Sequence, residues 1–402
     1  MRKLPPMTIA IDSKLPHVGT TIFTVMSALA VQHKAINLSQ GFPDFDGPEA
    51  LRSRVEYYLN SGFNQYPPMA GVPSLRQGVA TKVADLYGAQ VDAEDEVTIT
   101  AGATEALFCA IAAVVRQGDE VIVFDPAYDS YEPVVLLQGG RTVHIPLKAP
   151  SYRPDWDQVR DAITSKTRLI IINTPHNPTG AVWQAEDPAE LKSLVVEHGI
   201  FVVSDEVYEH IVFDGVAHES VCRDEELMAQ SFVISSFGKT YHVTGWKVGY
   251  CVAPRALTKE FRRVHQFVNF TVNTPMQLGI ADFLAEHPEH HLGLGAFYQK
   301  KRDFFCELLV GSRFSLTPSG GTYFQLLDYS AISDADDVSL AKQWTKEIQL
   351  ASIPVSVFYA DQEIDPREAG DARAAGRPKV LRFCFAKDDA TLTQAAEILC
   401  SL

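Results

Sequence analysis

Short runs of consecutive apolar residues alternate with longer segments of helical spacing along most of the chain. Strands that are buried on both faces show unbroken apolar runs, so each short run predicts a strand of a largely parallel sheet. The segments between them, such as 104–115 and 187–199, carry helical spacing and start or stop signals, which predicts helices over both faces of the sheet. The predicted strands are VTIT 97–100, VIVF 121–124, TVHI 142–145, LIII 169–172, FVVS 201–204, FVIS 232–235 and VGYCVA 248–253.

The pattern changes near residue 286 to longer, charged helices, followed by shorter apolar runs at 352–358 and 380–386. This change predicts a second, smaller α+β domain. We therefore expect an α/β protein with a large domain over 46–285 and a small domain formed by 1–45 and 286–402. Residues 361–378, rich in Asp, Arg and Ala, are expected to form an exposed loop.

Composition excludes several classes of protein. With 402 residues, 46% hydrophobic and 21% charged, the chain is typical of folded globular proteins, not of fibres or disordered chains. The net charge of −15 argues against nucleic-acid binding and against acidic membranes. No apolar run approaches the roughly 18 residues of a membrane span, and the six scattered cysteines show no paired spacing. We expect a cytoplasmic protein.

The segment SSFGKTYHVTGWKVGY, 235–250, places Lys239 in a loop at the end of a predicted strand. Most lysines are solvated surface residues. An ε-amine must be neutral to attack a carbonyl, however, and burial or a neighbouring cation such as Lys247 favours the neutral form. Lys239 is therefore a candidate for Schiff-base chemistry.

Two further polar segments follow predicted strands. In NTPHNPTG, 173–180, Pro178 keeps Asn177 out of the helical region, although a plain turn is an equal alternative. In SDEVY, 204–208, Asp205 stands at a strand end and Tyr208 follows it. Asp205 could instead cap a helix, and a metal site with Glu206 and His210 lacks a convincing third ligand.

Two features suggest anion binding. The strand–glycine–helix segment TAGATEAL, 100–107, offers free backbone N–H groups for a phosphate, as many α/β turns do. Arg382 interrupts the apolar strand VLRFCFA, and a buried guanidinium requires a carboxylate, supplied either by the protein or by a ligand.

Taken in order, these motifs resemble the class I aminotransferases of the fold-type I pyridoxal-phosphate superfamily. The resemblance runs from about residue 15 to the C-terminus and is nearest to the branch that contains bacterial methionine aminotransferase and the kynurenine/glutamine transaminases. Its motifs are NLSQGFPDF 37–45, FNQYPP 63–68, DPAYDSY 125–131, SFGKTYHVTGWKVGY 236–250 and LRFCF 381–385.

The resemblance implies pyridoxal 5′-phosphate as cofactor, a ping-pong transfer of the amino group from an L-amino acid to a 2-oxo acid, and no metal. Lys239 would form the Schiff base and carry the proton at the substrate α-carbon, while Asp205 would pair with the pyridinium nitrogen. Asn177 and Tyr208 would hydrogen-bond the 3-oxygen of the ring, and Tyr128 would stack on the ring. The phosphate would be held by Gly102, Ala103, Thr104, Ser236 and Lys247, with Tyr66 arriving from the other subunit of a homodimer.

On the substrate side, the resemblance implies that Arg382, Asn177 and the Gly41 backbone hold the α-carboxylate. The candidate side-chain pocket is formed by Ile22, Phe23, Tyr66, Tyr128 and Val272, although Ile22 and Phe23 could equally attach the N-terminal segment to the domain. These residues suit methionine, aromatic amino acids, glutamine or histidine. Lys247 replaces an arginine common in the class, and Thr104 replaces a tyrosine of some kynurenine-type relatives, which weakens the kynurenine assignment.

Three alternatives remain. The same Schiff-base chemistry would support β-elimination from cysteine S-conjugates, which releases pyruvate and ammonia. The fold also serves as an effector-binding module in transcription regulators, but this acidic chain leaves no room for a DNA-binding domain before residue 15. Finally, His287, His290 and His291 with Glu286 and Glu289 could bind a metal, although such exposed runs are usually solvated.

Overall fold

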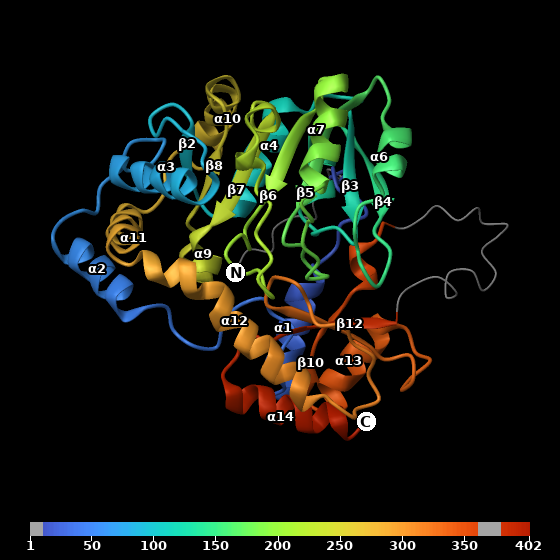
Figure 1. The fold of residues 1–402 in the computed structure, drawn as a ribbon. Helices are drawn as coiled ribbons and strands as arrows, with labels where there is room; N and C mark the ends of the chain where they lie inside the picture. The colour runs from blue at the N-terminus through green and yellow to red at the C-terminus, as the bar shows by residue number, and fades with distance from the viewer. Residues whose placement is uncertain (1–10, 361–378) are drawn as a thin grey trace, which may run out of the picture.

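A seven-stranded sheet forms the centre of the computed structural model, which describes residues 11–360 and 379–402 (Figure 1). The predicted loop 361–378 lies outside the described residues. The strands stand in the order β2-β8-β7-β6-β5-β3-β4. Their bounds are β2 Val97–Thr100, β3 Glu120–Asp125, β4 Arg141–Pro146, β5 Thr167–Asn173, β6 Phe201–Asp205, β7 Ser231–Ser236 and β8 Gly249–Val252.

Each predicted strand overlaps one of these seven, and the prediction of a largely parallel sheet is confirmed. β8 runs antiparallel to β2 and β7, whereas β3, β4, β5, β6 and β7 pair in parallel. Because the strands that carry Asn173, Asp205 and Ser236 are parallel neighbours, these residues end at the same edge of the sheet.

Helices cover both faces of the sheet, because alternate residues of each strand point to opposite faces. In β5, Ile170 and Ile172 join one core, and Leu169 and Ile171 join the core on the other side. The first core is completed by α3 Pro73–Tyr87, α7 Asp187–His198 and α11 Thr274–Glu286, and α2 Glu49–Asn60 packs on α11. The second core is completed by α4 Ala103–Val114, α5 Tyr131–Leu137 and α10 Arg255–Val268.

A third hydrophobic core lies below the large sheet in Figure 1, where the orange and red C-terminal elements meet the blue helix α1. Its strands form a three-stranded antiparallel sheet, β11-β12-β9, and a parallel pair, β1-β10. The elements are α1 Ile22–His33, β1 Ile36–Asn37, α12 Pro288–Leu308, β9 Phe324–Asp328, α13 Asp337–Glu347, β10 Leu350–Ala351, β11 Ile353–Pro354, β12 Val380–Cys384 and α14 Asp389–Cys400. The domain division at residue 285 stays a prediction.

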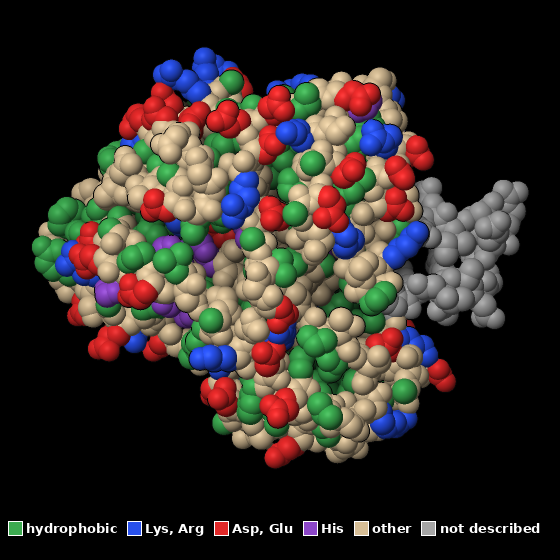
Figure 2. All heavy atoms as spheres, viewed as in Figure 1, with side chains coloured by type: hydrophobic (Ala, Val, Ile, Leu, Met, Phe, Trp, Pro, Cys, Tyr) green, Lys and Arg blue, Asp and Glu red, His purple; other side chains and the backbone are tan. Residues whose placement is uncertain are grey.

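The histidines near the start of α12 are less exposed than the sequence suggested. Histidine side chains gather over α11 and α12 in Figure 2, but His291 is only 6% exposed and His290 is half-buried. The start of α12 packs on neighbouring segments, where the His290 ring lies 3.1 Å from the Thr240 carbonyl oxygen and the His291 ring lies 5.0 Å from the His210 ring. The expectation of a solvated run is therefore wrong for His291.

Among the described helices, none combines the length and the apolar character needed to cross a membrane.

Candidate active site

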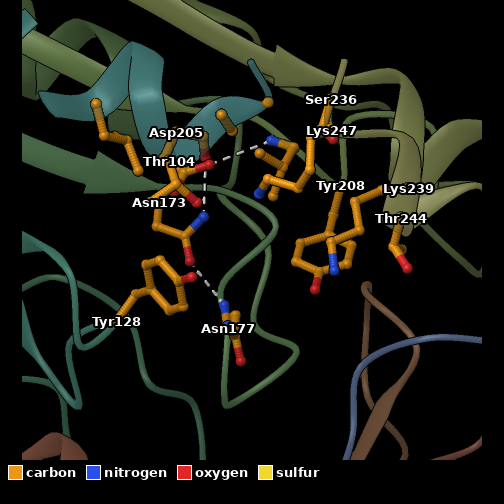
Figure 3. Close-up of a pocket in the computed structure, with 14 residues that line it drawn as sticks. Thr104, Tyr128, Asn173, Asn177, Asp205, Tyr208, Ser236, Lys239, Thr244 and Lys247 are labelled. Atoms are coloured by element: carbon orange, nitrogen blue, oxygen red, sulfur yellow. Dashed lines mark hydrogen bonds between the residues drawn. The ribbon is translucent and has the colours of Figure 1, made fainter. Parts of the chain in front are cut away.

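A pocket opens at the carboxyl edge of the parallel strands, where ligand sites of open α/β sheets form. Figure 3 shows polar side chains converging on it from β5, β6 and β7 and from the loops that follow these strands. The residues that line it are Gly102, Ala103, Thr104, Leu107, Tyr128, Asn173, Asn177, Asp205, Val207, Tyr208, Ser236, Lys239, Thr244 and Lys247.

Lys239 lies on α9, Phe237–Thr240, a single turn that directly follows β7. Its Nζ donates to the Gly41 carbonyl oxygen at 3.0 Å and lies 5.7 Å from the ring centroids of Tyr208 and Tyr323. Burial, assisted by the positive charges of Arg382 and Lys247, lowers the pKa of Lys239 to about 8. About a tenth of its amine is therefore neutral at pH 7, far more than for a free lysine.

Asp205 is the last residue of β6 and is buried in the pocket wall. Its carboxylate accepts hydrogen bonds from the Tyr131 hydroxyl at 2.8 Å and the Val207 N–H at 3.4 Å. Burial raises the pKa of Asp205 to about 6, because these bonds and the charge of Lys239 offset the desolvation only in part. Asp205 is thus a buried carboxylate whose negative charge would be stabilised by a cationic group in the pocket.

Arg382 projects from β12 and is 1% exposed. Its guanidinium donates to Asn177 Oδ1 at 2.7 Å and the Ser39 carbonyl oxygen at 2.8 Å, and it stacks 3.8 Å from the Phe324 ring centroid. Within the described residues, its Nε has no hydrogen-bond partner and no carboxylate lies within ion-pair distance of it, although the charge of Asp129 acts on it from further away. Since a buried guanidinium needs a negative partner, this arrangement fits a carboxylate supplied by a ligand.

The opposite end of the pocket gathers groups that bind anions. Gly102 is the N-cap of α4 and has φ of 76°, and a Cβ there would lie 3.1 Å from Lys247 Nζ. The cap makes no side-chain hydrogen bond to the helix, so the first N–H groups of α4 remain available beside Lys247 and Ser236. Burial lowers the pKa of Lys247.

The segment from Asp205 to His210 has two sides. Asp205 and Tyr208, three residues apart, line the pocket. Glu206 accepts from the Ser204 hydroxyl at 2.7 Å and lies 2.8 Å from the His218 ring. Glu209 accepts a hydrogen bond from the Lys82 ammonium at 2.6 Å. It also accepts hydrogen bonds from the hydroxyl groups of Tyr87, Ser235 and Tyr250.

Glu206 and His210 therefore do not join Asp205 at one metal site, because their side chains bond other partners. The structure does bring Glu105, Cys109 and His265 together. Hydrogen bonds account for that group: Glu105 lies 2.7 Å from the His265 ring and accepts the Cys109 thiol and the Ala101 N–H.

Four of the five residues predicted to form the side-chain pocket lie apart from the lining of this pocket, and only Tyr128 belongs to it. Tyr66 is 83% exposed and faces a separate hollow together with Val272, which is part of the core beneath the sheet. Ile22 packs against the third core. Phe23 packs there too, but its ring centroid lies 5.2 Å from the Arg382 guanidinium.

Sequence reasoning missed four residues near the pocket. Thr244 and Asn173 line it, Tyr131 donates to Asp205, and Tyr323 donates to the Gly41 carbonyl oxygen. Asn173 and Tyr131 had a usable signal, since Asn173 ends the apolar run LIII and Tyr131 closes the motif DPAYDSY. Thr244 also lies within a motif, SFGKTYHVTGWKVGY, whereas the sequence gives no comparable signal for Tyr323.

The family model described as aminotransferase class I and II matches residues 33–399. The chain belongs to this family and is a pyridoxal-phosphate-dependent aminotransferase.

Two relatives illustrate the similarity. The chain is 52% identical over 388 residues to a methionine aminotransferase of Escherichia coli K12, covering 96% of this chain and 97% of that protein. It is 32% identical over 415 residues to human kynurenine–oxoglutarate transaminase 3, covering 96% and 89%.

Solved structures agree with this assignment. YbdL of Escherichia coli, for which a methionine aminotransferase function was identified, superposes with a TM-score of 0.92 at 52% identity, covering 98% of this chain and 100% of that one. Aspartate aminotransferase of Thermus thermophilus with maleate gives a TM-score of 0.87 at 28% identity, with coverages of 98% and 100%.

The residues present fit pyridoxal 5′-phosphate. The glycine turn, the open start of α4 and Lys247 suit a phosphate. The buried carboxylate of Asp205 suits a protonated pyridine, and the pKa of Lys239, about 8, suits an amine that must react with an aldehyde.

Proposed function

We propose that this aminotransferase moves the amino group of methionine and of other neutral or aromatic L-amino acids to a 2-oxo acid. The observation that carries the proposal is that the buried Arg382 guanidinium has no carboxylate in ion-pair contact among the described residues. It lies 2.7 Å from Asn177 Oδ1, and its charge acts on the reactive lysine, Lys239. The 52% identity to a methionine aminotransferase supports the choice of donor.

The anion-binding end of the pocket would hold the cofactor. In the proposed arrangement Gly102, Ala103 and Thr104 offer backbone N–H groups to the phosphate, and Ser236 and Lys247 add a hydroxyl and a charge. Tyr128 would stack on the ring. Because Lys247 is a point charge and not a planar fork, it would balance the phosphate charge without fixing its orientation.

When bound, pyridoxal phosphate supplies an electron sink for the electrons released at the substrate α-carbon. The protein's part is to keep the ring nitrogen protonated, which is the role proposed for Asp205. Tyr131 donates to the Asp205 carboxylate and so orients it. Asn177 and Tyr208 would hydrogen-bond the 3-oxygen of the ring.

Lys239 would act twice, first as the amine that binds the cofactor and then as the base that moves a proton. A base works best when its pKa lies near the working pH, and burial brings the pKa of Lys239 to about 8. Once displaced by the substrate's amino group, Lys239 would take the proton from the α-carbon and return it to the cofactor side.

Arg382 would bind the substrate α-carboxylate, with Asn177 and the Gly41 backbone beside it. This contact is common to all α-amino acids, so selectivity depends on the remaining lining. Phe23 lies next to the guanidinium, and Tyr128 lines the pocket. Among the described pocket residues there is no second arginine to pair with a side-chain carboxylate, which favours neutral and aromatic donors.

We further propose a homodimer in which Tyr66 of each subunit completes the site of the other. Apolar side chains gather at the edge of the molecule over α2 and the segment after it in Figure 2. The exposed apolar residues of α2 and of the segment after it are Tyr57, Leu59, Phe63 and Tyr66. Two further exposed residues, Phe267 and Phe270, extend this set, since the Phe270 ring contacts the Tyr66 ring. Such a patch is expected at a subunit interface.

Visible absorption of the purified protein tests the proposal. Adding L-methionine without an acceptor should bleach the band of the bound cofactor, and a 2-oxo acid should restore it. A band that methionine leaves unchanged would contradict the proposed donor. Sedimentation of wild type and of Phe270→Glu tests the dimer, because a buried charge at the interface should give monomers.

A further inference from the structure

The carbonyl oxygen of Gly41 accepts two hydrogen bonds inside the active site. Lys239 Nζ donates to it at 3.0 Å, and the Tyr323 hydroxyl donates to it at 2.5 Å. A carbonyl oxygen has two lone pairs, so both donors can be satisfied at once. The free amine of Lys239 therefore rests on an acceptor that Tyr323 also contacts.

Tyr323 is held in place from several sides. Its side chain is fully buried and its ring stands edge-on to Tyr208, with 5.2 Å between centroids. Tyr298 packs against it at 5.5 Å. The phenol therefore has little freedom to leave the Gly41 carbonyl.

The residue before Tyr323 has an unusual backbone conformation. Thr322 has φ of 65°, although β-branched residues rarely occupy the left-handed region. It is buried, its N–H donates to the Ile211 carbonyl oxygen at 2.9 Å, and its hydroxyl accepts the Phe324 N–H at 3.1 Å. Strain of this kind persists where the surroundings fix it, and it is concentrated at functional sites.

The Gly41 side of the contact is equally restricted. A Cβ at Gly41 would lie 2.8 Å from the Phe324 ring, so the backbone passes too close to that ring for any side chain. The carbonyl thus has a fixed place, and Lys239 Nζ lies 5.7 Å from the ring centroids of both Tyr208 and Tyr323.

We propose that Tyr323 is a positioning residue for Lys239: its hydroxyl fixes the Gly41 carbonyl, which holds the free lysine amine at the place from which it reacts. This inference rests on the proposed function, because it concerns the lysine that binds the cofactor. Tyr323 itself donates to the carbonyl and not to the lysine.

Capture of the cofactor by the full chain stripped of it gives a direct test. The Lys239 nitrogen bonds to the aldehyde carbon of pyridoxal phosphate and water leaves, so the visible band reports one bond-forming step. Pyridoxine 5′-phosphate carries an alcohol in place of the aldehyde and binds without this step. The two ligands therefore separate positioning of the amine from binding of the ring and phosphate.

Tyr323→Phe removes only the hydroxyl. We expect its capture rate at saturating pyridoxal phosphate to fall about ten-fold, because a misplaced reacting group slows the step, while the Kd of pyridoxine 5′-phosphate stays unchanged. Tyr298→Phe is the matched control, since Tyr298 is also buried and its hydroxyl lies 3.0 Å from His242 Nδ1, away from Gly41. It should capture the cofactor at the wild-type rate.

The pH dependence distinguishes position from charge. Charged and titratable groups act on Lys239 from several elements, namely Asp205, Lys247, Arg382 and Cys384, with Tyr208 and Tyr323 at its sides. If Tyr323 positions the amine, the loss persists on the alkaline plateau, where Lys239 is neutral in every variant.

Three results would overturn the inference: capture by Tyr323→Phe at the wild-type rate, a loss that vanishes on the alkaline plateau, or an equal loss in Tyr298→Phe. Failure of the wild type to capture pyridoxal phosphate would instead contradict the proposed function itself.

Discussion

Two carboxylates four residues apart, Asp205 and Glu209, are both buried in the same segment but have opposite electrostatic surroundings. Asp205 faces the pocket, no cation among the described residues is in hydrogen-bond contact with it, and burial raises its pKa to about 6. Burial also opposes the charge of Glu209, but the ion pair with Lys82 keeps the pKa of Glu209 well below its usual range. The segment thus carries one incompletely stabilised charge and one fully paired charge.

This difference distinguishes a residue that binds a ligand from a residue that stabilises the fold. A protein that leaves a buried charge uncompensated loses stability unless a ligand supplies the partner. Asp205 and Arg382 fit that description, whereas Glu209 with its four donors does not. Changes on the pocket side should therefore affect turnover, and changes on the far side should affect folding.

The largest effect is expected from Asp205→Asn. The amide cannot keep the ring nitrogen protonated, so kcat should fall on the order of 10⁴-fold, the size of loss known for replacing a carboxylate that stabilises a cationic ring with its amide. Steady-state kinetics with methionine measures the loss. The melting temperature of the cofactor-free variant should not fall. A large decrease would show that Asp205 stabilises the fold, as Glu209 does.

Lys82→Met should act mainly on stability. Removing one partner of a buried pair leaves Glu209 uncompensated and should cost about 3 to 5 kcal/mol in the free energy of unfolding. The double variant Lys82→Met with Glu209→Gln should recover most of this loss, because Gln still accepts hydrogen bonds without a charge. Denaturant unfolding of the four proteins gives the coupling energy, and simple additivity would refute the pairing argument.

The pH dependence of stability should reveal Asp205 in the cofactor-free protein. Its folded pKa of about 6 lies above the unfolded value of roughly 3.9, so the folded state holds the proton more tightly. This contribution is complete below about pH 4 and is lost as the pH rises through 6, by about 3 kcal/mol. Wild type should lose this much relative to Asp205→Asn between pH 4 and 8; parallel curves would contradict the shift.

Arg382→Ala should have the smallest effect of the four. Loss of a charge-assisted pair should lower kcat/KM about 10- to 150-fold, equally for methionine and for aromatic donors. Comparing the two donor classes in the same variant measures this. A loss confined to one class would show that Arg382 reads the side chain and not the carboxylate.

Much of the fold followed from the sequence, because unbroken apolar runs such as LIII predict buried parallel strands whatever surrounds them. The chemistry at strand ends was also visible, as with Lys239 and Asp205. Burial that depends on partners distant in sequence could not be predicted. The residues around Lys82 do not indicate that Glu209, 127 residues away, will pair with it. Likewise, nothing in the letters around Thr322 predicts its positive φ.

The two-sided segment after β6 also limits how the gene can change. Asp205 and Tyr208 share one side, and Glu206 and Glu209 share the other, at a spacing of three residues. Deleting or inserting one codon between Asp205 and Glu209 would shift the residues after the change to the other side of the segment. A glutamate could then face the cofactor site, and Lys82 would lose its carboxylate partner. Substitutions can be tested singly here, but the length of this segment cannot drift without both sides failing together.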